Sequence, residues 1–250
     1  MKKFLLTITA IFMCIGAHAK TETINWYMDG NTYATTQCET GSDIILPQTP
    51  YKYGYTFNGW FGYTPIEYLE STGTQYIDTG VVANETTEAE IEFEEADNIL
   101  FMVSTGGWNS NNFGIVAKSG AGYIVFYMNC DGYTNYTVKS KISGNIKLLL
   151  DGIYFNNERL GITSGNIPAL TKFSTTHTIP LFARKWNNNI SEKFAYKLKY
   201  LKIWQDYVLV RDFIPVLDSN GIPCMFDKVE KKFYYNAGTG QFIAGPVIGE

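Results

Sequence analysis

Four glutamates at alternating positions, Glu88, Glu90, Glu92 and Glu94, have the residue type and spacing for acid–base chemistry. Side chains two residues apart on a β-strand share one face and lie about 6.7 Å apart. Side chains of this length could bring two carboxyl groups to the separation of about 5–5.5 Å that retaining glycoside hydrolysis uses. The candidate catalytic pair is Glu90 and Glu94, which share that face but lie two such steps apart.

The same pattern also fits a strand with one dry and one wet face. Ala89, Ile91 and Phe93 alternate with the glutamates, which is the arrangement of a half-exposed strand over a core. We favour this non-catalytic interpretation. A Cys–His pair would require His177 with Cys130 or Cys224, and none of these has the local sequence of a nucleophile motif. One histidine outside the leader and no CxxC pair give no support to a zinc site.

Aromatic and amide side chains could bind a sugar. A strand at 123–129 would place Tyr123 and Tyr127 on one face, opposite Ile124 and Phe126. Flat rings stack on sugars, and amides bond their hydroxyls. The ligand-binding candidates are therefore Trp108, Asn112, Tyr123, Tyr127, Trp186 and Asn187. The alternative is that the tyrosines fill a sheet contact and the asparagines only form turns.

The first nineteen residues have the pattern of an export signal. Lys2 and Lys3 precede an apolar run, and Ala17-His18-Ala19 is a small-x-small cleavage site. A lipoprotein interpretation of Cys14 is the less favoured alternative, because Met13 stands where a small residue is usual. The apolar run is too short to span a bilayer, and no later segment is longer. We expect an exported protein, secreted or at the cell envelope, with no transmembrane segment.

Composition limits the partners and the redox chemistry. Removal of the leader takes Lys+Arg from 20 to 18 against 24 Asp+Glu, a net charge of −6 that disfavours nucleic-acid binding. Three cysteines remain, so not all can pair. Cys130 with Cys224 is the conceivable disulfide, because Cys38 falls in the other unit. Buried free thiols are the alternative.

The distribution of strand and turn signals predicts two all-β units, residues 20–62 and 63–250. Aromatic residues make up 16% of the chain, and the glycines number 23, both typical of a turn-rich β fold. In the first unit, strands are expected at 24–27 and 33–38 around an Asp-Gly turn, with Ile44 to Leu46 buried. In the second, regularly spaced strands predict a two-sheet sandwich: 75–78, 88–94, 99–104, 113–117, 123–129, 136–140, 146–150, 179–183, 194–204, 208–215 and 232–235.

The first unit ends in Gly54-Tyr55-Thr56-Phe57-Asn58-Gly59-Trp60, after Leu46-Pro47 and Pro50. This segment resembles the internalin B-repeat family, also called the Listeria-Bacteroides repeat. The resemblance implies a small β-grasp-like module of bacterial surface and secreted proteins, serving as a spacer or adhesive module. Family members often carry several copies, whereas this chain has one.

The second unit contains Tyr68-Leu69-Glu70-Ser71-Thr72-Gly73-Thr74-Gln75-Tyr76-Ile77-Asp78-Thr79-Gly80, Leu181-Phe182-Ala183-Arg184 and Leu201-Lys202-Ile203-Trp204. With 209–216, 225–229 and 233–240, these segments resemble laminin G-like or concanavalin A-like jelly-roll domains. The resemblance implies a two-sheet antiparallel jelly roll. It also implies loop calcium, with Asp78, Asp131 and Asp151 as candidate ligands, although each also suits a turn or strand end. Glycoside hydrolases of this fold use Glu-x-Asp-x-Glu, whereas here Glu92 stands at the Asp position.

Three functions stay open on the sequence. The first is an exported bacterial binding or adhesion protein that recognises a glycan or an extracellular protein surface without catalysis. The second is a glycoside hydrolase using Glu90 and Glu94. The third is a structural surface component with no ligand of its own. The first is the prediction.

Overall fold

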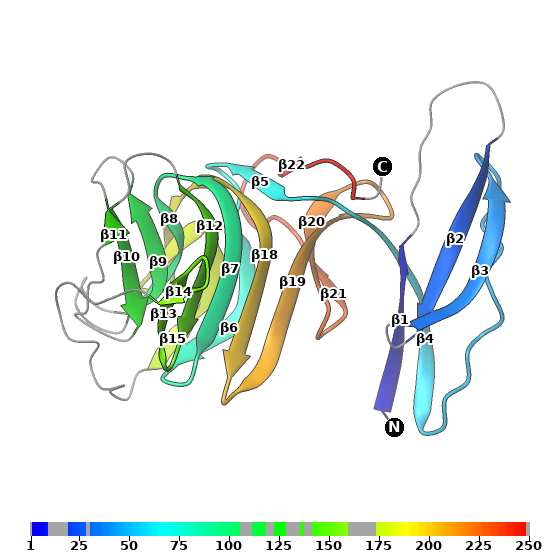
Figure 1. The fold of residues 1–250 in the computed structure, drawn as a ribbon, viewed down its shortest axis with the longest axis horizontal. Coiled ribbons are helices and arrows are strands. Elements are labelled where there is room, and N and C mark those ends of the chain that lie inside the picture. Colours follow the sequence, from blue (N-terminus) through cyan, green and yellow to red (C-terminus); the bar gives the residue numbers. More distant parts are fainter. Residues whose placement is uncertain are drawn as a thin grey trace.

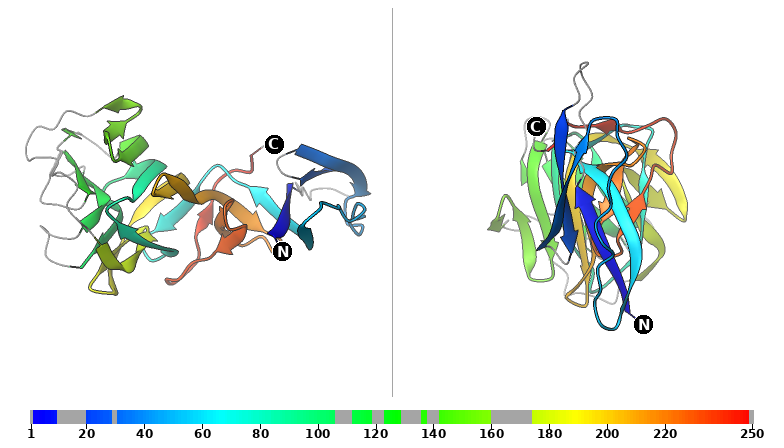
Figure 2. Two further views of the ribbon diagram at one scale, coloured as in Figure 1. Left: turned by 90° about the horizontal axis from the view of Figure 1, so that it is seen from below. Right: turned by 90° about the vertical axis from the view of Figure 1, so that its right-hand side faces the viewer.

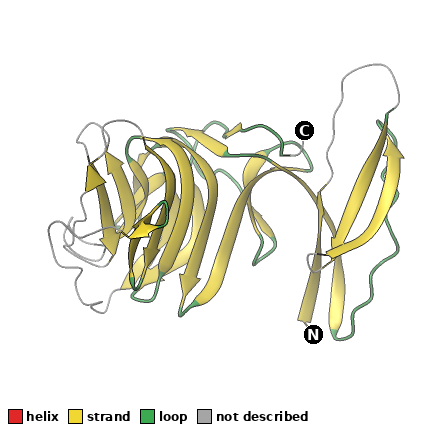
Figure 3. Ribbon diagram, in the orientation of Figure 1, coloured by secondary structure: helices red, strands yellow, loops and turns green. Residues whose placement is uncertain are grey.

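The chain folds entirely into β-strands, turns and extended segments wherever its structure is described (Figure 3). The computed structural model describes residues 2–9, 20–28, 31–105, 112–118, 123–128, 136–137, 142–159 and 174–248. No helix in these ranges is long and apolar enough to cross a membrane. The predicted all-β class is confirmed.

The small N-terminal unit is a mixed sheet in the order β4-β1-β2-β3 (Figure 1). Its strands are β1 (Lys2–Thr9), β2 (Thr21–Met28), β3 (Asn31–Glu39) and β4 (Tyr55–Pro65). β2 and β3 form the predicted antiparallel hairpin, and Trp26, fully buried, packs with Ile24 and Cys38. β1, which lies within the predicted leader, pairs in parallel with β4.

The large unit stacks mainly antiparallel sheets as a sandwich, with one parallel pair, β8 and β16 (Figures 1 and 2). One sheet has the order β14-β13-β12-β7-β18-β19, from β14 (Glu158–Arg159), β13 (Gly152–Phe155), β12 (Ile142–Leu149), β7 (Glu88–Ala96), β18 (Ala195–Gln205) and β19 (Val208–Asp218). It is extended by β5 (Leu69–Thr72), β20 (Pro223–Asp227), β21 (Lys232–Tyr234) and β22 (Ile243–Ala244).

The second layer of the sandwich contains the remaining strands. A six-stranded sheet has the order β11-β10-β9-β8-β16-β17, from β11 (Tyr136–Thr137), β10 (Tyr123–Met128), β9 (Asn112–Lys118), β8 (Ile99–Ser104), β16 (Ala183–Trp186) and β17 (Asn189–Lys193). A separate pair joins β6 (Ile77–Asn84) to β15 (Ser174–Leu181).

The core lies between these layers. Ala89, Ile91 and Phe93 of β7 are buried, whereas the glutamates between them are partly exposed on the outer face. The same hydrophobic cluster includes Leu201 of β18 and Phe101 of β8. The alternation in the sequence therefore correctly predicted which face of β7 is dry.

The predicted strand at 179–183 is broken at Phe182, where the chain reverses: 179–181 belong to β15 and Ala183 to β16. Phe182 has φ of 61°, a left-handed conformation that is unusual for a bulky side chain. Its N–H donates to the carbonyl of Leu100 at 3.1 Å, and its ring centroid lies 4.4 Å from that of Tyr196. β15 therefore ends in one sheet, and β16 begins in the other. Packing of the buried Phe182 ring stabilises this reversal. The sequence has no glycine or proline at that residue that would have predicted it.

β4 crosses the predicted boundary between the two units without a loop. Tyr63 lies opposite Thr9 of β1 and opposite Asp218 of β19, so one strand belongs to both sheets. In the small unit, the expectation that residues 44–46 are buried was wrong for two of them. Ile45 and Leu46 are 68% and 60% exposed, because 43–52 form no strand that would turn them inward.

Cys224 is a free, fully buried thiol in β20, as in the alternative without a disulfide. It packs with Tyr63, Val216 and Phe226. Burial, followed by the nearby Asp218 carboxylate, raises the pKa of the Cys224 thiol to about 12, which suppresses the reactive thiolate. Cys130, its conceivable partner, lies outside the described residues.

Candidate functional site

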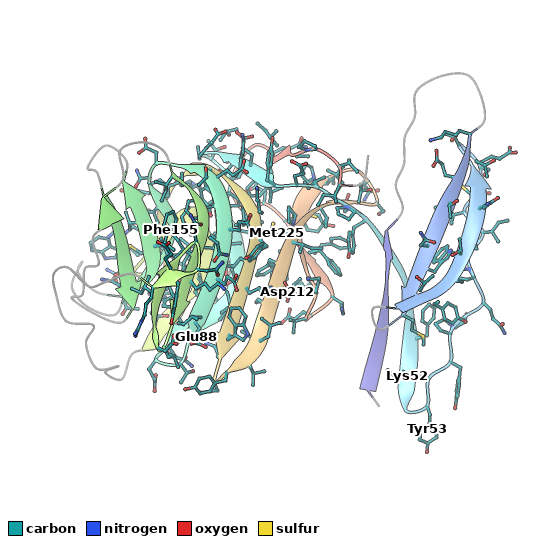
Figure 4. All side chains as sticks on the ribbon, in the orientation of Figure 1. Lys52, Tyr53, Glu88, Phe155, Asp212 and Met225 are labelled. Atoms are coloured by element: carbon teal, nitrogen blue, oxygen red, sulfur yellow. The ribbon has the colours of Figure 1, made fainter. Side chains whose placement is uncertain are left out.

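The last residues of β6, β8, β10, β12, β16 and β18 lie at one end of the sandwich, which we call the turn end. β7 begins beside Trp204, near the end of β18, and only two residues separate β7 from β8. β8 therefore runs back to the end where β7 begins. There Ser104, its last residue, pairs with Asn112 of β9 and Trp186 of β16. Glu88 marks this end at the bottom of the sandwich in Figure 4.

Trp186 is held in place at the turn end by several contacts. In the amide orientation that pairs both groups, the Asn187 side chain accepts a hydrogen bond from the indole Nε1 at 3.0 Å and donates to the Thr105 carbonyl at 3.1 Å. The Asn187 N–H donates to the Ser104 carbonyl at 3.2 Å. The guanidinium carbon of Arg184 lies 4.0 Å from the ring centroid, a cation–π contact. The half-buried indole is thus anchored against the end of β8.

The sheet brings some of the other predicted sugar-binding residues to this end and separates one. Asn112 lies there but is fully buried, so its amide is not presented to solvent. Tyr127 pairs with β9 two positions along from Asn112, near the same end. Tyr123 pairs with the last residue of β9, at the opposite end. Trp108 falls between β8 and β9, outside the described residues.

Asp78, one of the proposed calcium ligands, is occupied by protein groups. Its carboxylate accepts hydrogen bonds from Thr178 Oγ1 at 2.6 Å and from the Gly80 N–H at 3.0 Å, and pairs with Lys185 Nζ at 3.0 Å. Burial by itself would raise the pKa of Asp78, but the hydrogen bonds and the Lys185 charge outweigh burial and lower it. A cation here would have to displace the ammonium of Lys185.

The Asp78 ion pair predicts a pH-dependent contribution to stability. A carboxyl group whose pKa is lowered by folding stabilises the native state above its unfolded pKa, about 3.8, and this contribution is lost as the pH falls through the folded value. We expect Asp78→Asn to be less stable than the parent by about 1 kcal/mol at pH 7, since the group is partly exposed. Urea unfolding from pH 7 to 2 should show the gap closing below about pH 4; a gap independent of pH would contradict this.

The other calcium candidates do not form a cation site among the described residues. Asp151 follows β12 at the turn end, where its carboxylate accepts a hydrogen bond from Tyr154 Oη at 3.1 Å and its carbonyl oxygen accepts one from Arg159. Asp131 lies in the connection after β10, outside the described residues. Over the described ranges, no three His, Cys, Asp or Glu side chains cluster in a way that could hold a metal ion.

Glu90, the first candidate catalytic carboxylate, lies on the outer face of β7 and is held by three side chains. Its Oε1 accepts hydrogen bonds from Tyr200 Oη at 2.8 Å and Asn145 Nδ2 at 3.1 Å, and Lys147 Nζ lies 3.6 Å away. Burial and then the Glu90 hydrogen bond raise the pKa of Tyr200, so the phenol stays protonated and donates. Glu90 is therefore a hub of a polar network that joins β7, β12 and β18.

Glu94, the second candidate, is neutralised by a lysine. Lys199 Nζ lies 2.6 Å from Glu94 Oε1 and 3.8 Å from Glu92 Oε1. Its hydrogen bond to Glu94 raises the pKa of Lys199, despite partial desolvation, which keeps the ammonium charged. Each member of the candidate pair thus has its own partners. This arrangement is that of a cross-strand charge ladder on an outer sheet face.

Tyr207 is a residue at the turn end that the sequence argument missed. It lies in the turn between β18 and β19 and is 79% exposed, next to Val208 at 62%. Exposed aromatic side chains at such positions are common in recognition surfaces. The available signal was an Asp-Tyr pair in a tight turn between two alternating strands, where Asn-Gly or Asp-Gly is expected.

No family model matches the chain, and no match was found among curated proteins or solved structures.

Proposed function

We propose that this chain is an exported bacterial protein, secreted or at the cell surface, that binds a glycan without catalysing a reaction. The observation that carries the proposal is the indole of Trp186, anchored at the turn end through its N–H to Asn187 and by Arg184 on the ring. A flat aromatic ring stacks on the apolar face of a sugar, and pre-orientation of that ring lowers the entropy cost of binding. The pairing of β9 and β10 also directs Tyr127 to this end.

The proposal assigns a role to each part of the chain. Residues 1–19 act as an export signal, 20–62 as a B-repeat-like spacer or adhesive module, and 63–250 as a laminin G-like or concanavalin A-like jelly roll that holds the ligand. In the full chain, β4 pairs with β1 in the small unit and with β19 in the large unit. Removal of the leader would remove β1, so this pairing does not set the spacing between the units in the mature protein.

Trp186→Ala is expected to weaken glycan binding at least tenfold, because it removes the stacking surface at the turn end. The measurement is a glycan-array screen of the mature chain, followed by titration calorimetry on the strongest ligand. Asn187→Ala should weaken binding to a smaller extent, since it frees the indole N–H without removing the ring.

Tyr123→Ala is the control for Trp186→Ala, because Tyr123 begins β10 at the opposite end of the sheet. Its affinity should match that of the parent, and circular dichroism should show both variants folded. Equal losses in the two variants would place the binding surface away from the turn end. Binding of an extracellular protein with no glycan binding would replace the ligand class, and no ligand of either kind would favour a structural component.

The alternative of a glycoside hydrolase can be tested separately. Glu90 accepts hydrogen bonds from Tyr200 and Asn145, and Glu94 is paired with Lys199. Both carboxylates are therefore engaged by protein groups and are not free to protonate or attack a sugar. We therefore expect no turnover of a polysaccharide panel by the parent chain. Turnover of a β-glucan that Glu90→Gln abolishes would support the hydrolase instead.

A further inference from the structure

We propose that Tyr207 is a second stacking side chain at the turn end and that the glycan it takes is uncharged. This inference rests on the proposed function, since it names the ligand class of the same end of the sandwich. It depends on four features of the β18–β19 turn: its backbone, its exposure, its rigidity and the charges around it.

The backbone of this turn is unusual for a tyrosine. Three two-residue turns in the described chain have both residues at positive φ: Asn156–Asn157, Asn187–Asn188 and Asp206–Tyr207, with φ values of 50° and 66°, 44° and 66°, and 50° and 62°. Asparagine tolerates this left-handed region, and both residues of each of the first two turns are asparagines. A tyrosine there strains the backbone. Of these three turns, only the third has a residue other than asparagine at these positions.

Packing within the described chain does not compensate for that strain. Tyr207 is 79% exposed and makes no side-chain hydrogen bond or ring contact with the described residues. Val208, the next residue, and Val82, whose carbonyl accepts a hydrogen bond from Gln205, are also exposed, at 62% and 41%. A strained residue that stabilises nothing in its own fold is a candidate for contact with a partner.

The turn is held rigidly enough to present the ring. Gln205 Nε2 donates to the Val82 carbonyl at 2.8 Å and to Thr87 Oγ1 at 3.1 Å. The Asp206 N–H donates to Thr86 Oγ1 at 3.1 Å. These bonds fasten the tip of β18–β19 to the turn between β6 and β7. A ring fixed in this way binds at a lower entropy cost than one on a loose loop.

The charges around Tyr207 select the partner. Asp206 is exposed, Glu85 and Glu88 are partly exposed, and residues 82–90 and 203–210 contain no lysine or arginine. Lys202 and Arg211 flank the second segment, and Arg211 is paired with Glu230. Carboxylates accept hydrogen bonds from sugar hydroxyls, whereas they repel acidic polysaccharides, anionic lipids and nucleic acids. An aromatic ring beside carboxylates therefore fits an uncharged sugar.

The test compares Tyr207→Asn and Tyr207→Phe with the parent by affinity electrophoresis in gels that contain laminarin, xylan, mannan or polygalacturonate. Tyr207→Asn gives the turn the residue type of the other two turns. It should shift the folding equilibrium about tenfold toward the native state, and it should weaken binding to an uncharged polysaccharide about tenfold. Tyr207→Phe keeps the ring and should bind as the parent does.

The outcomes separate this inference from the proposed function. Loss of binding in Tyr207→Asn together with an unchanged or raised melting temperature supports the inference, because a damaged fold would lower both. If Tyr207→Asn binds as the parent does while Trp186→Ala does not, the inference fails and the proposed function stands. If polygalacturonate retards the parent more than the uncharged polysaccharides do, the assigned ligand class is wrong. If no polysaccharide or arrayed glycan binds the parent, the proposed function fails as well.

Discussion

Replacing Asp227 by alanine is expected to lower the free energy of unfolding by about 3–5 kcal/mol. This carboxylate is fully buried at the end of β20. Oδ1 accepts hydrogen bonds from the N–H groups of Asp212 and Val229 at 2.8 and 3.0 Å, and Oδ2 accepts one from Glu230 N–H at 3.2 Å. Oδ2 also lies 3.6 Å from Arg211 Nε. Alanine would leave three backbone N–H groups and the Arg211 guanidinium without this acceptor. The loss in free energy of unfolding is measured by urea denaturation at pH 7.

Glu230→Ala is the matched control, because it also removes a carboxylate from Arg211. Glu230 Oε1 lies 2.8 Å from Arg211 Nη1, but the side chain is 41% exposed, so water can replace it. We expect a loss of about 1 kcal/mol or less. Asp227→Asn keeps an acceptor oxygen and should fall between the two. Equal urea midpoints for the two alanine variants would show that burial of Asp227 adds nothing to its role.

Two strands of the large unit, β7 and β8, could be predicted because their side-chain patterns are local. The alternating apolar residues Ala89, Ile91 and Phe93 predict the buried face of β7, and all three are buried in the structure. Strand β8, Ile99–Ser104, is a run of five apolar residues followed by a serine; it was predicted with its observed bounds, and every residue in it is buried. In both cases a period-two or continuous pattern between turn signals sufficed.

The arrangement of these strands could not be predicted, because long-range contacts set it. β8 and β16 pair in parallel although Ser104 and Trp186 are far apart in the chain, and nothing near either residue specifies the partner. The reversal that makes this pairing possible occurs at Phe182, a buried aromatic in a conformation that favours glycine. Propensity predicts a continuous strand there, and tertiary packing overrides it.

Part of the candidate site could be predicted from residue types alone. Trp186 and Asn187 were chosen as a ring beside an amide, and the swapped orientation of the Asn187 amide joins them through the indole N–H. Asn112 was chosen on the same grounds, but its burial depends on the neighbouring strands rather than on its own residue type. Tyr207 could have been found as a violation of turn chemistry, which is where functional residues are to be sought when no motif identifies them.

Gln75→Leu is expected to lower the free energy of unfolding by about 3–5 kcal/mol, because several buried polar groups would lose their partner at once. The side chain is 2% exposed. Its Oε1 accepts hydrogen bonds from Ser71 Oγ at 3.1 Å and Thr72 N–H at 2.9 Å, and its Nε2 donates to the Gln241 carbonyl at 2.8 Å. This one amide thereby joins the segment that opens the large unit to the segment that closes it. Urea denaturation with a constant m-value measures the loss.

Gln205→Leu provides the same substitution at a site with fewer and less buried bonds. Gln205 donates to Val82 O and Thr87 Oγ1 from a partly exposed position, so we expect a loss of about 1 kcal/mol. If Gln75→Leu costs no more than this, the join between the two segments depends on other contacts, such as the hydrogen bond from Thr74 Oγ1 to the Thr239 carbonyl. A large difference would show that a buried amide between distant segments, rather than apolar packing alone, closes the sandwich.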